Sequence, residues 1–323
     1  MTRRVAICIQ VYNEGQFLAE TIESVLNQSF EDFDLIVSDN HSKDATPDIV
    51  ARYQARDSRV IAWQPDQFCK SLEHARYMTR RVNQLEHPAT LFLGGHDVLD
   101  RDYLAHLHTS FEANPQAAVV VGSGFEIDLE GKTLREWPSI AQLKGGLMPF
   151  RPLVVLMSLF YNIAAFGLTA RRVRQGVAWR HECVGADHLW LAEAALMGDI
   201  VVEPSAVIHT RRTEGAGEHA TYFRKHVSDD LRAENIIANF ERQLEWAAHI
   251  NDLAFAAFPE SVRNINLAAL LGNYFSRYGV AQLSAVDGAL ERWLGSESGL
   301  RLASQMSATG QSLRTLIAGP ATR

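Results

Sequence analysis

Three clusters of polar residues each follow a short apolar run in the first hundred residues. The clusters occupy positions 11–15, 39–44 and 94–97. Glu14 and Asp39 offer carboxylate acceptors of the kind that a nucleobase and a ribose need. His96 and Asp97 offer an imidazole nitrogen and a carboxylate, which are common ligands of divalent metal ions. Together these residue types predict a site for a nucleoside diphosphate, whose phosphates require a metal ion or other positive charge.

The segments that must position these clusters alternate between short apolar runs and amphipathic stretches. The expected strands are 5–11, 35–39, 60–63, 90–93 and 118–122, and the expected helices are 15–27, 46–56, 71–84 and 102–114. Alternating strands and helices predict a parallel α/β sheet that is covered by helices on both faces. Ligands of such sheets bind beyond the carboxyl ends of the strands, so we expect the three clusters to meet at one edge.

Three ordered segments near the N-terminus carry a family resemblance. Residues 11–14 read Val-Tyr-Asn-Glu, residues 21–30 read Thr-Ile-Glu-Ser-Val-Leu-Asn-Gln-Ser-Phe, and residues 34–40 read Asp-Leu-Ile-Val-Ser-Asp-Asn. In this order and spacing they resemble the opening of family 2 glycosyltransferases. The resemblance continues at 75–76, 93–104 and 185–212 and so covers about the first two thirds of the chain. It implies a GT-A fold, which is a Rossmann-like, mostly parallel sheet flanked by helices.

The resemblance implies a nucleotide-diphosphate sugar as the donor and gives each matching residue a role. Asp39 is expected to contact the uracil of the donor, while Glu14 and the backbone of the first cluster hold the nucleoside. Arg76 is expected to be a cation of the donor site, and Arg211 or Arg212 is expected to hold phosphate. The implied donor-binding residues are Val11, Tyr12, Glu14, Asp39, Arg76, Gly95, His96 and Arg211.

The metal motif of the family is altered in this chain. The resemblance aligns residues 94–96 with an Asp-x-Asp motif, but Gly94 and His96 occupy the two Asp positions. Asp97 is the remaining carboxylate of the segment. We therefore expect Mn²⁺ or Mg²⁺ to be held by His96 and Asp97, with His209 completing the ligand set.

A further polar motif, Gly-Ala-Asp-His at 185–188, begins a predicted helix. It resembles the acidic helix start of the family, whose carboxylate acts as general base, and this places the catalytic role on Asp187. The positive end of the helix dipole favours an acidic side chain at this position. An inverting transfer needs such a base to deprotonate the acceptor hydroxyl as that hydroxyl attacks the anomeric carbon. The alternative for Asp187 is a helix cap without a catalytic role.

Composition and charge exclude several classes of protein. A formal net charge of -7 gives no broad basic face for nucleic acid. Three cysteines without CxxC spacing fit a reducing compartment, and residues 1–5 contain no apolar signal-peptide core. The uncharged stretch 152–170 is long enough to span a membrane, but candidate catalytic residues lie on both sides of it, so we expect a buried helix leading into a strand. We expect a cytoplasmic protein, with the inner face of the membrane as the alternative location.

These observations combine into one predicted organisation and function. We expect residues 1–213 to form the GT-A catalytic domain, with the nucleotide-sugar site in 1–125 and the acceptor and base region in 126–213. Residues 214–323 are expected to form a helical appendage, with helices at 218–256 and 261–294.

The expected reaction is inverting transfer of a sugar from a uridine diphosphate donor to a saccharide or lipid-linked acceptor in glycan biosynthesis. The alternative is a catalytically inactive GT-A-like protein that binds a nucleotide-sugar or a partner. A nucleotidyltransferase is disfavoured because residues 12–16 lack a glycine-rich, basic phosphate loop. Peripheral membrane association and a homo-oligomer stay open.

Overall fold

The computed structural model describes residues 4–69, 71–137, 142–146, 149–158, 167–177, 185–212 and 233–259. Two compact units can be distinguished in the chain. One consists of Met1–Gly146, Leu159–Trp179 and Met197–Ser228, and the other of Leu147–Ser158, Arg180–Leu196 and Asp229–Arg323. The domain boundary at residue 213 stays a prediction, while the units group 180–196 with the C-terminal part of the chain.

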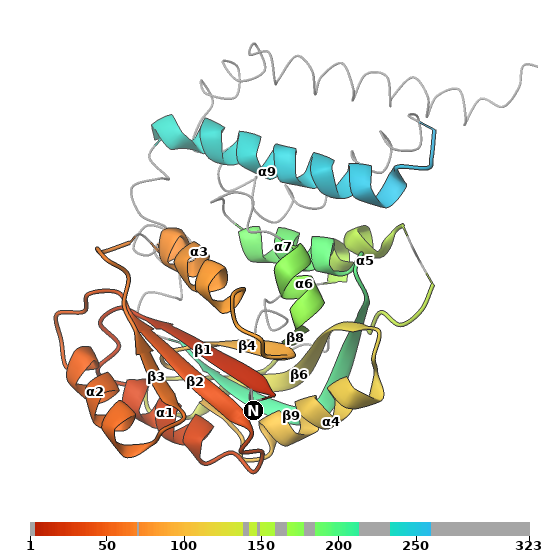
Figure 1. The fold of residues 1–323 in the computed structure, drawn as a ribbon. Helices are drawn as coiled ribbons and strands as arrows, with labels where there is room; N and C mark the ends of the chain where they lie inside the picture. The colour runs from red at the N-terminus through yellow and green to blue at the C-terminus, as the bar shows by residue number, and fades with distance from the viewer. Residues whose placement is uncertain are drawn as a thin grey trace, which may run out of the picture. The chain divides into compact units, whose positions relative to one another are not determined.

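The first unit is built on a sheet whose leading strands are parallel (Figure 1). β1 (Val5–Val11) pairs with β2 (Phe33–Asp39) on one side and with β4 (Ala89–Gly94) on the other, and β2 pairs with β3 (Val60–Trp63). These strands are short, mostly apolar runs, as is typical of strands covered on both faces. The parallel α/β sheet expected from the sequence is confirmed for this half.

The other half of the sheet differs from the sequence prediction. β8 (Leu168–Ala170) runs antiparallel between β4 and β6 (Ala117–Ile127). β6 pairs in parallel with β9 (Asp199–Arg211), β5 (Val98–Leu99) pairs antiparallel with β9, and β7 (Thr133–Glu136) pairs antiparallel with β6. The resulting order is β3-β2-β1-β4-β8-β6-β9-β5, in which β6 and β9 run in the same direction as β1 to β4. β6 extends beyond the predicted strand 118–122 because β9 pairs with it along its length.

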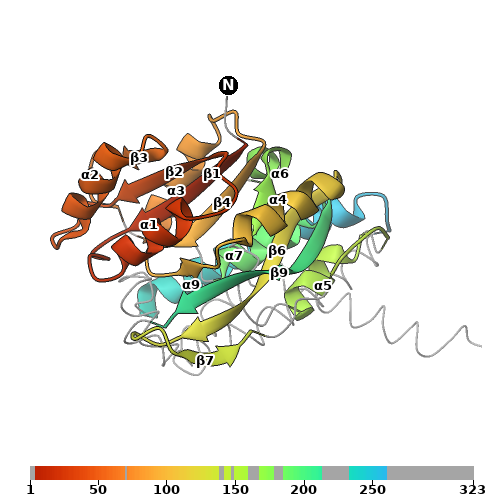
Figure 2. The same ribbon diagram turned by 90° about the horizontal axis from the view of Figure 1, so that it is seen from below.

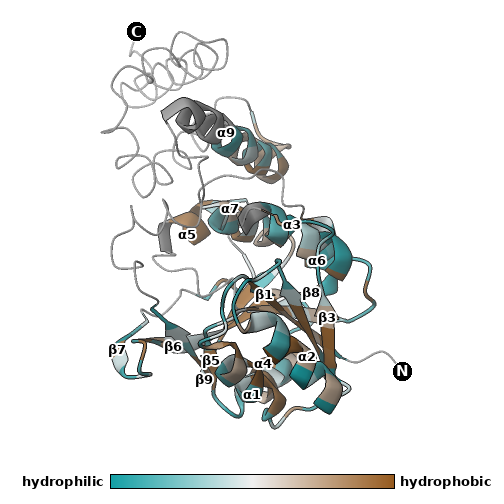
Figure 3. Cartoon of the chain, turned by 90° about the vertical axis from the view of Figure 1, so that its left-hand side faces the viewer, coloured by the Kyte–Doolittle hydropathy of each residue, from teal (hydrophilic) through white to brown (hydrophobic). Residues whose placement is uncertain are grey.

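Helices cover both faces of this sheet (Figures 1 and 2). On one face lie α1 (Leu18–Leu26), α2 (Thr46–Arg56) and α4 (Tyr103–Ala113). On the other lie α3 (Ser71–Val82) and α6 (Arg171–Gly176). Figure 3 shows apolar residues gathered on the strands and polar residues on the outward turns of the helices. The sequence-predicted helices of the first 125 residues are therefore confirmed, with ends shifted by a few residues.

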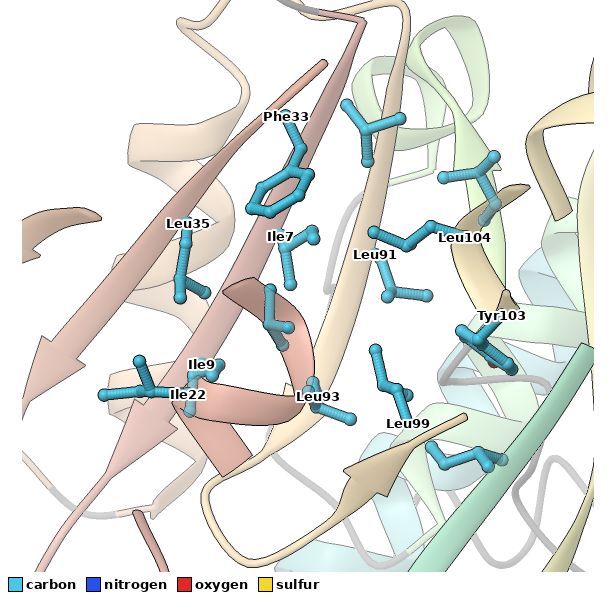
Figure 4. Close-up of a cluster of buried hydrophobic side chains, with 14 of the residues drawn as sticks. Ile7, Ile9, Ile22, Phe33, Leu35, Leu91, Leu93, Leu99, Tyr103 and Leu104 are labelled. Atoms are coloured by element: carbon cyan, nitrogen blue, oxygen red, sulfur yellow. The ribbon is translucent and has the colours of Figure 1, made fainter. Parts of the chain in front are cut away.

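Alternate residues of β1 face two different hydrophobic cores. Ile7 belongs to the larger core, which also contains Ile22 of α1 and Tyr103 of α4 (Figure 4). Cys8 points to the opposite face, where it packs with Met78 of α3. Since both faces are buried, the strands can present polar groups only at their ends.

The second unit is helical in its described parts. α5 (Arg151–Ser158) and α9 (Ala233–Phe255) each pack against α7 (Ala186–Ala194). α9 confirms the predicted helix 218–256 over its described residues, whereas 218–232 and the predicted helix 261–294 lie outside the described part of the chain. None of the helices in the described ranges has the length and apolar character to cross a membrane. Within the stretch 152–170, α5 occupies the start and β8 the end, as the prediction of a helix leading into a strand requires.

Two glycines of β6 allow β9 to approach closely. A Cβ atom at Gly122 would lie 2.3 Å from the carbonyl oxygen of Ala206, and one at Gly124 would lie 2.5 Å from that of Ile208. Both distances are shorter than van der Waals contact, and the opposing atoms belong to backbone that cannot move independently. The close pairing of β6 with β9 therefore requires glycine at both positions.

We predict that Gly122→Ala destabilises the protein by about 1–3 kcal/mol, the usual cost of an added methyl group in a packed interior. Gly146→Ala is the matched control, because a Cβ atom at Gly146 would meet no atom within 4 Å. Urea unfolding of the two variants measures the difference. Equal stability of both variants would show that β6 and β9 can separate without cost.

Candidate functional site

The loops after β1 and β2 are joined by hydrogen bonds at the carboxyl ends of the strands. The Asn13 N–H donates to Ser42 Oγ at 2.9 Å, and the Glu14 N–H donates to Thr46 Oγ1 at 2.9 Å. In return the Lys43 N–H donates to Asn13 Oδ1 at 2.8 Å. A hydrogen bond between His96 and Glu14 adds the third cluster. Residues 11–15, 39–44 and 94–97 thus meet at one edge of the sheet, which we call the strand-end edge, and the convergence expected from the sequence is confirmed.

Asp39 ends β2 with a buried carboxylate. Its Oδ1 accepts the N–H of Ser42 at 3.1 Å, and its Oδ2 accepts a longer hydrogen bond from Gln64 Nε2 at 3.4 Å. One oxygen is therefore fixed by the adjacent loop, and the other is held more weakly. A carboxylate in this state can accept a hydrogen bond from a ligand at Oδ2 without disturbing the loop.

The loop after β3 contributes an aromatic side chain that the sequence motifs did not indicate. The Asn40 side chain holds this loop through two hydrogen bonds, to the carbonyl oxygen of Cys69 at 2.7 Å and from its N–H at 2.9 Å. Phe68 then lies with its ring 5.1 Å from that of Tyr12, in an edge-to-face arrangement. Both rings are exposed, Tyr12 by 45% and Phe68 by 53%. Two exposed aromatic rings at the strand-end edge provide surfaces on which a planar base can stack.

His96 links the strand-end edge to Glu14. Its Nδ1 lies 3.1 Å from Glu14 Oε1, and its Nε2 lies 3.9 Å from Asp97 Oδ1. Burial opposes protonation of the imidazole, but the hydrogen bond to Glu14 and the charges of Asp97 and Glu14 outweigh it. The pKa of His96 is therefore raised above its usual value. The imidazole is oriented by its carboxylate neighbours.

Asp97 is buried, and its position accounts for the glycine at position 94 of the motif. Its Oδ1 accepts the N–H of Arg211 at 3.0 Å, and burial raises the pKa of Asp97 against the opposing charge of His96. A Cβ atom at Gly94 would lie only 2.6 Å from Asp97 Oδ2. The Asp97 carboxylate thus fills the space into which an aspartate at position 94 would extend. Gly95 is likewise tight, since a Cβ atom there would lie 2.6 Å from Val11 Cγ1.

Arg211 is buried, and its guanidinium donates to protein acceptors. Its Nη2 donates to Glu20 Oε2 at 2.7 Å, its Nε to the carbonyl oxygen of His96 at 3.1 Å, and its Nη1 to that of Leu129 at 2.8 Å. The ring of Phe17 lies 4.7 Å from Cζ. Phosphate binding by Arg211 stays a prediction, and the geometry favours a structural part for this side chain.

The predicted metal ligands are brought together only in part. His209 Nε2 lies 2.9 Å from Asp100 Oδ1 instead of joining the other two ligands. Within the part of the chain that the structure describes, no group of three or more His, Cys, Asp or Glu side chains could hold a metal ion. His96 and Asp97 nevertheless fit a divalent ion by ligand type, so these two residues would hold it.

The two remaining sequence-predicted residues lie on helices. Arg76 is half-buried in α3, on the face of the sheet opposite α1. Asp187 lies in the first turn of α7, in the second unit, with 32% of its side chain exposed. Its Oδ1 accepts the N–H of His188 at 2.9 Å and lies 3.2 Å from His188 Nδ1. Asp187 thus has a fixed orientation, and its role as base stays a prediction.

Comparison with known proteins identifies the part of the chain that carries the strand-end edge. Residues 6–157 match the family model of glycosyl transferase family 2. This match covers a little under half of the chain. The uncharacterized glycosyltransferase MJ1057 of Methanocaldococcus jannaschii is 27% identical over 135 residues, which are 41% of this chain and 46% of that relative. The chain spans less than half the length of the curated relatives it matches, between 17% and 46%.

Solved structures extend the likeness beyond residues 6–157 to the fold of more of the chain. Residues 1–349 of S. aureus TarS, in complex with UDP-GlcNAc, have a TM-score of 0.51 at 15% identity, covering 85% of this chain and 92% of TarS 1–349. The mannosyltransferase PcManGT from Pyrobaculum calidifontis, in complex with GDP-Man and Mn²⁺, has a TM-score of 0.51 at 14% identity, covering 99% of this chain and 89% of that one. The GT-A fold expected from the sequence is confirmed.

We predict that Glu14→Gln lowers the pKa of His96, because the carboxylate that favours the imidazolium is lost. Titration of the His96 ring resonances by NMR, in metal-free protein, measures this. Glu112→Gln is the matched control, since Glu112 lies 3.8 Å from His108 and should leave His96 unchanged.

The raised pKa of His96 also affects the stability of the folded protein. A histidine whose pKa is raised on folding stabilises the protein below its unfolded-state pKa of about 6.5, and this contribution is lost as the pH rises through the folded-state pKa. Glu14→Gln should therefore reduce stability at acidic pH more than at pH 8. If the pKa of His96 is unchanged in Glu14→Gln, Glu14 is not the group that raises it.

Proposed function

We propose that the protein is a glycosyltransferase that binds a nucleotide-diphosphate sugar at the strand-end edge and transfers the sugar to an acceptor in glycan biosynthesis. The observation that carries this proposal is the Asp39 carboxylate next to the exposed ring pair of Tyr12 and Phe68. A base stacked on these rings can donate an N–H to Asp39 Oδ2. The nucleotide-sugar complexes of TarS and PcManGT, which share the fold, support the same class of donor.

Uridine is the nucleoside that we propose. Because Asp39 Oδ1 already accepts the N–H of Ser42, Oδ2 is the oxygen left for the base. Uracil offers one ring N–H flanked by carbonyl oxygens, whereas guanine offers an exocyclic amine as well. The amide nitrogen of Gln64, which is close to Asp39 Oδ2, is suited to donate to a flanking carbonyl oxygen.

The diphosphate is proposed to lie over His96, whose imidazole is held by Glu14. Mn²⁺ or Mg²⁺, when bound by His96 and Asp97, would supply positive charge that favours departure of the diphosphate. The protein's own contribution is to orient the imidazole through Glu14 and the Asp97 carboxylate through the N–H of Arg211. In the absence of the metal ion, a protonated His96 can instead neutralise part of the phosphate charge at this position.

For the chemical step we propose a single displacement with inversion at the anomeric carbon. The acceptor hydroxyl forms the new C–O bond while the bond to the diphosphate breaks, and Asp187 accepts the hydroxyl proton. The fixed orientation of the Asp187 carboxylate by the N–H of His188 supports this role. The family resemblance supports a saccharide or lipid-linked acceptor and a cytoplasmic location, at the membrane face where the acceptor is lipid-linked.

A second candidate function is a GT-A protein that binds a nucleotide-sugar without transferring it. The observation that favours it is the altered motif, in which Gly94 replaces a carboxylate and His209 lies apart from His96 and Asp97. Hydrolysis or transfer of the sugar from a UDP-sugar separates the two functions. The inactive protein would bind the donor and leave it intact.

We predict that Asp39→Asn weakens UDP binding by roughly tenfold to a hundredfold, or about 1–3 kcal/mol. The Ser42 N–H needs an oxygen acceptor, so the new amide would turn its NH₂ group toward the N–H of the base, donor against donor. Isothermal titration calorimetry with UDP and with GDP measures the effect. Asp66→Asn is the matched control, because Asp66 is an exposed carboxylate in the same region. Unchanged UDP affinity in Asp39→Asn would remove Asp39 from the base site.

We predict that Asp187→Asn lowers kcat by about two to four orders of magnitude, the usual range for loss of a general base. Asparagine keeps the size of aspartate but cannot accept a proton at neutral pH. UDP affinity should stay within about twofold, because the interaction is made mainly in the transition state. Steady-state kinetics and calorimetry on the same preparation give both quantities. A variant that keeps most of its transferase rate would leave Asp187 with a structural role only.

A further inference from the structure

α7 carries a carboxylate in an almost completely buried helix. Glu193, near its C-terminal end, is only 3% exposed. The other buried residues of the helix are Ala186, His188, Leu189, Leu191, Ala192 and Ala194. A carboxylate in such surroundings is strongly unfavourable unless it is hydrogen-bonded, so its partners are expected to constrain the helix.

Two of its partners come from α9, which lies far along the chain in the same unit. The indole Nε1–H of Trp246 donates to Glu193 Oε2 at 2.7 Å, and Trp246 is fully buried. His249 Nε2 lies 3.6 Å from Glu193 Oε1. Trp246 and His249 are three residues apart and so share one face of α9. Glu193, Trp246 and His249, which we call the Glu193 clamp, join the end of α7 to the middle of α9.

The candidate base, Asp187, is half-buried and lies on another face of α7. Asp187 precedes Glu193 by six residues, which corresponds to about 240° around the helix axis and about 9 Å along it. The two side chains therefore leave α7 on different faces and at opposite ends. Because the helix is short, fixing its last turn to α9 also fixes the direction of its first turn.

We propose that the Glu193 clamp is a positioning device for Asp187, through which the C-terminal helix α9 takes part in catalysis. This inference rests on the proposed function, because it assigns the clamp to the base of the transfer reaction. It gives α9 a part in turnover, whereas the sequence predicts only a helical appendage. Glu193, Trp246 and His249 are positioning residues, since they act through the helix and not on the substrate.

The test compares Trp246→Phe with Leu253→Ala in the full chain. Trp246→Phe removes the N–H donor and leaves an aromatic ring, and Leu253→Ala changes an exposed residue on the same helix. We expect kcat of Trp246→Phe to fall about tenfold to a hundredfold, as displacement of a reacting group by a fraction of an ångström to 1 Å can cause. UDP affinity should stay within about twofold, and Leu253→Ala should behave as the wild type.

A second measurement tests whether the fall in kcat depends on Asp187. In an Asp187→Asn background, Trp246→Phe should lower the residual rate no further, because the base on which the clamp acts is already gone. Amide hydrogen exchange of residues 186–194 should be faster in Trp246→Phe than in the wild type, with exchange in β1 and β2 unchanged. Should Trp246→Phe fail to fold, Glu193→Leu removes the same hydrogen bond while filling the space with an apolar side chain.

Two results would overturn the proposal: a folded variant with wild-type kcat, or an equal loss of rate with and without Asp187→Asn. If the wild-type protein transfers no sugar, the proposed function fails first, and the exchange measurement still decides on the clamp. Unchanged protection of residues 186–194 in Trp246→Phe would then refute it.

Discussion

A guanidinium buried at the end of β9 needs acceptors inside the protein, and Arg211 finds them on three segments that are distant in sequence. These are Glu20 on α1, the carbonyl oxygen of His96, and the turn that follows β6. The peptide N–H of the same residue donates to Asp97. An unpaired buried charge costs several kcal/mol, so these contacts have to form together. The strand-end edge therefore takes its geometry partly from the last strand of the first unit.

The altered metal motif follows from this constraint. The N–H of Arg211 holds the Asp97 carboxylate by a hydrogen bond to Oδ1. The Oδ2 atom of Asp97 then occupies the space next to Gly94, so a side chain at position 94 would collide with it. His96 then remains as the partly exposed group of the motif, oriented by Glu14. The departure from two aspartates is thus a coherent local packing arrangement and is compatible with a site that still binds phosphate.

The sequence predicts the first half of the sheet well, because β1 to β4 are continuous apolar runs and strands buried on both faces show this pattern. The sequence does not predict the full length of β9, because Glu203, Pro204 and Ser205 interrupt its apolar run. Its extent as one strand depends on pairing with β6. The sequence does not indicate the structural role of Arg211 either. A basic residue is expected to be solvated or to bind phosphate unless its burial is known.

Among the candidate site residues, Asp39, Glu14 and His96 could be found because each follows a predicted strand. Phe68 could not, since it lies in a loop whose position depends on the hydrogen bonds between Asn40 and Cys69. The Glu193–Trp246 hydrogen bond is equally invisible in the sequence, because it joins residues 53 positions apart without a shared motif.

The proposed donor site and the proposed base are held in place by different sets of the hydrogen bonds described above. Asp39 and the loops around it belong to the first unit, whereas Asp187 and the Glu193 clamp belong to the second. Substitutions in networks without shared partners usually have additive effects, and those within one network do not. Donor affinity and the rate of the chemical step should therefore respond to different substitutions. On the proposed function, a change of acceptor or of base would leave the nucleotide site intact, because Ser42 and Gln64, which hold Asp39, belong to the first unit.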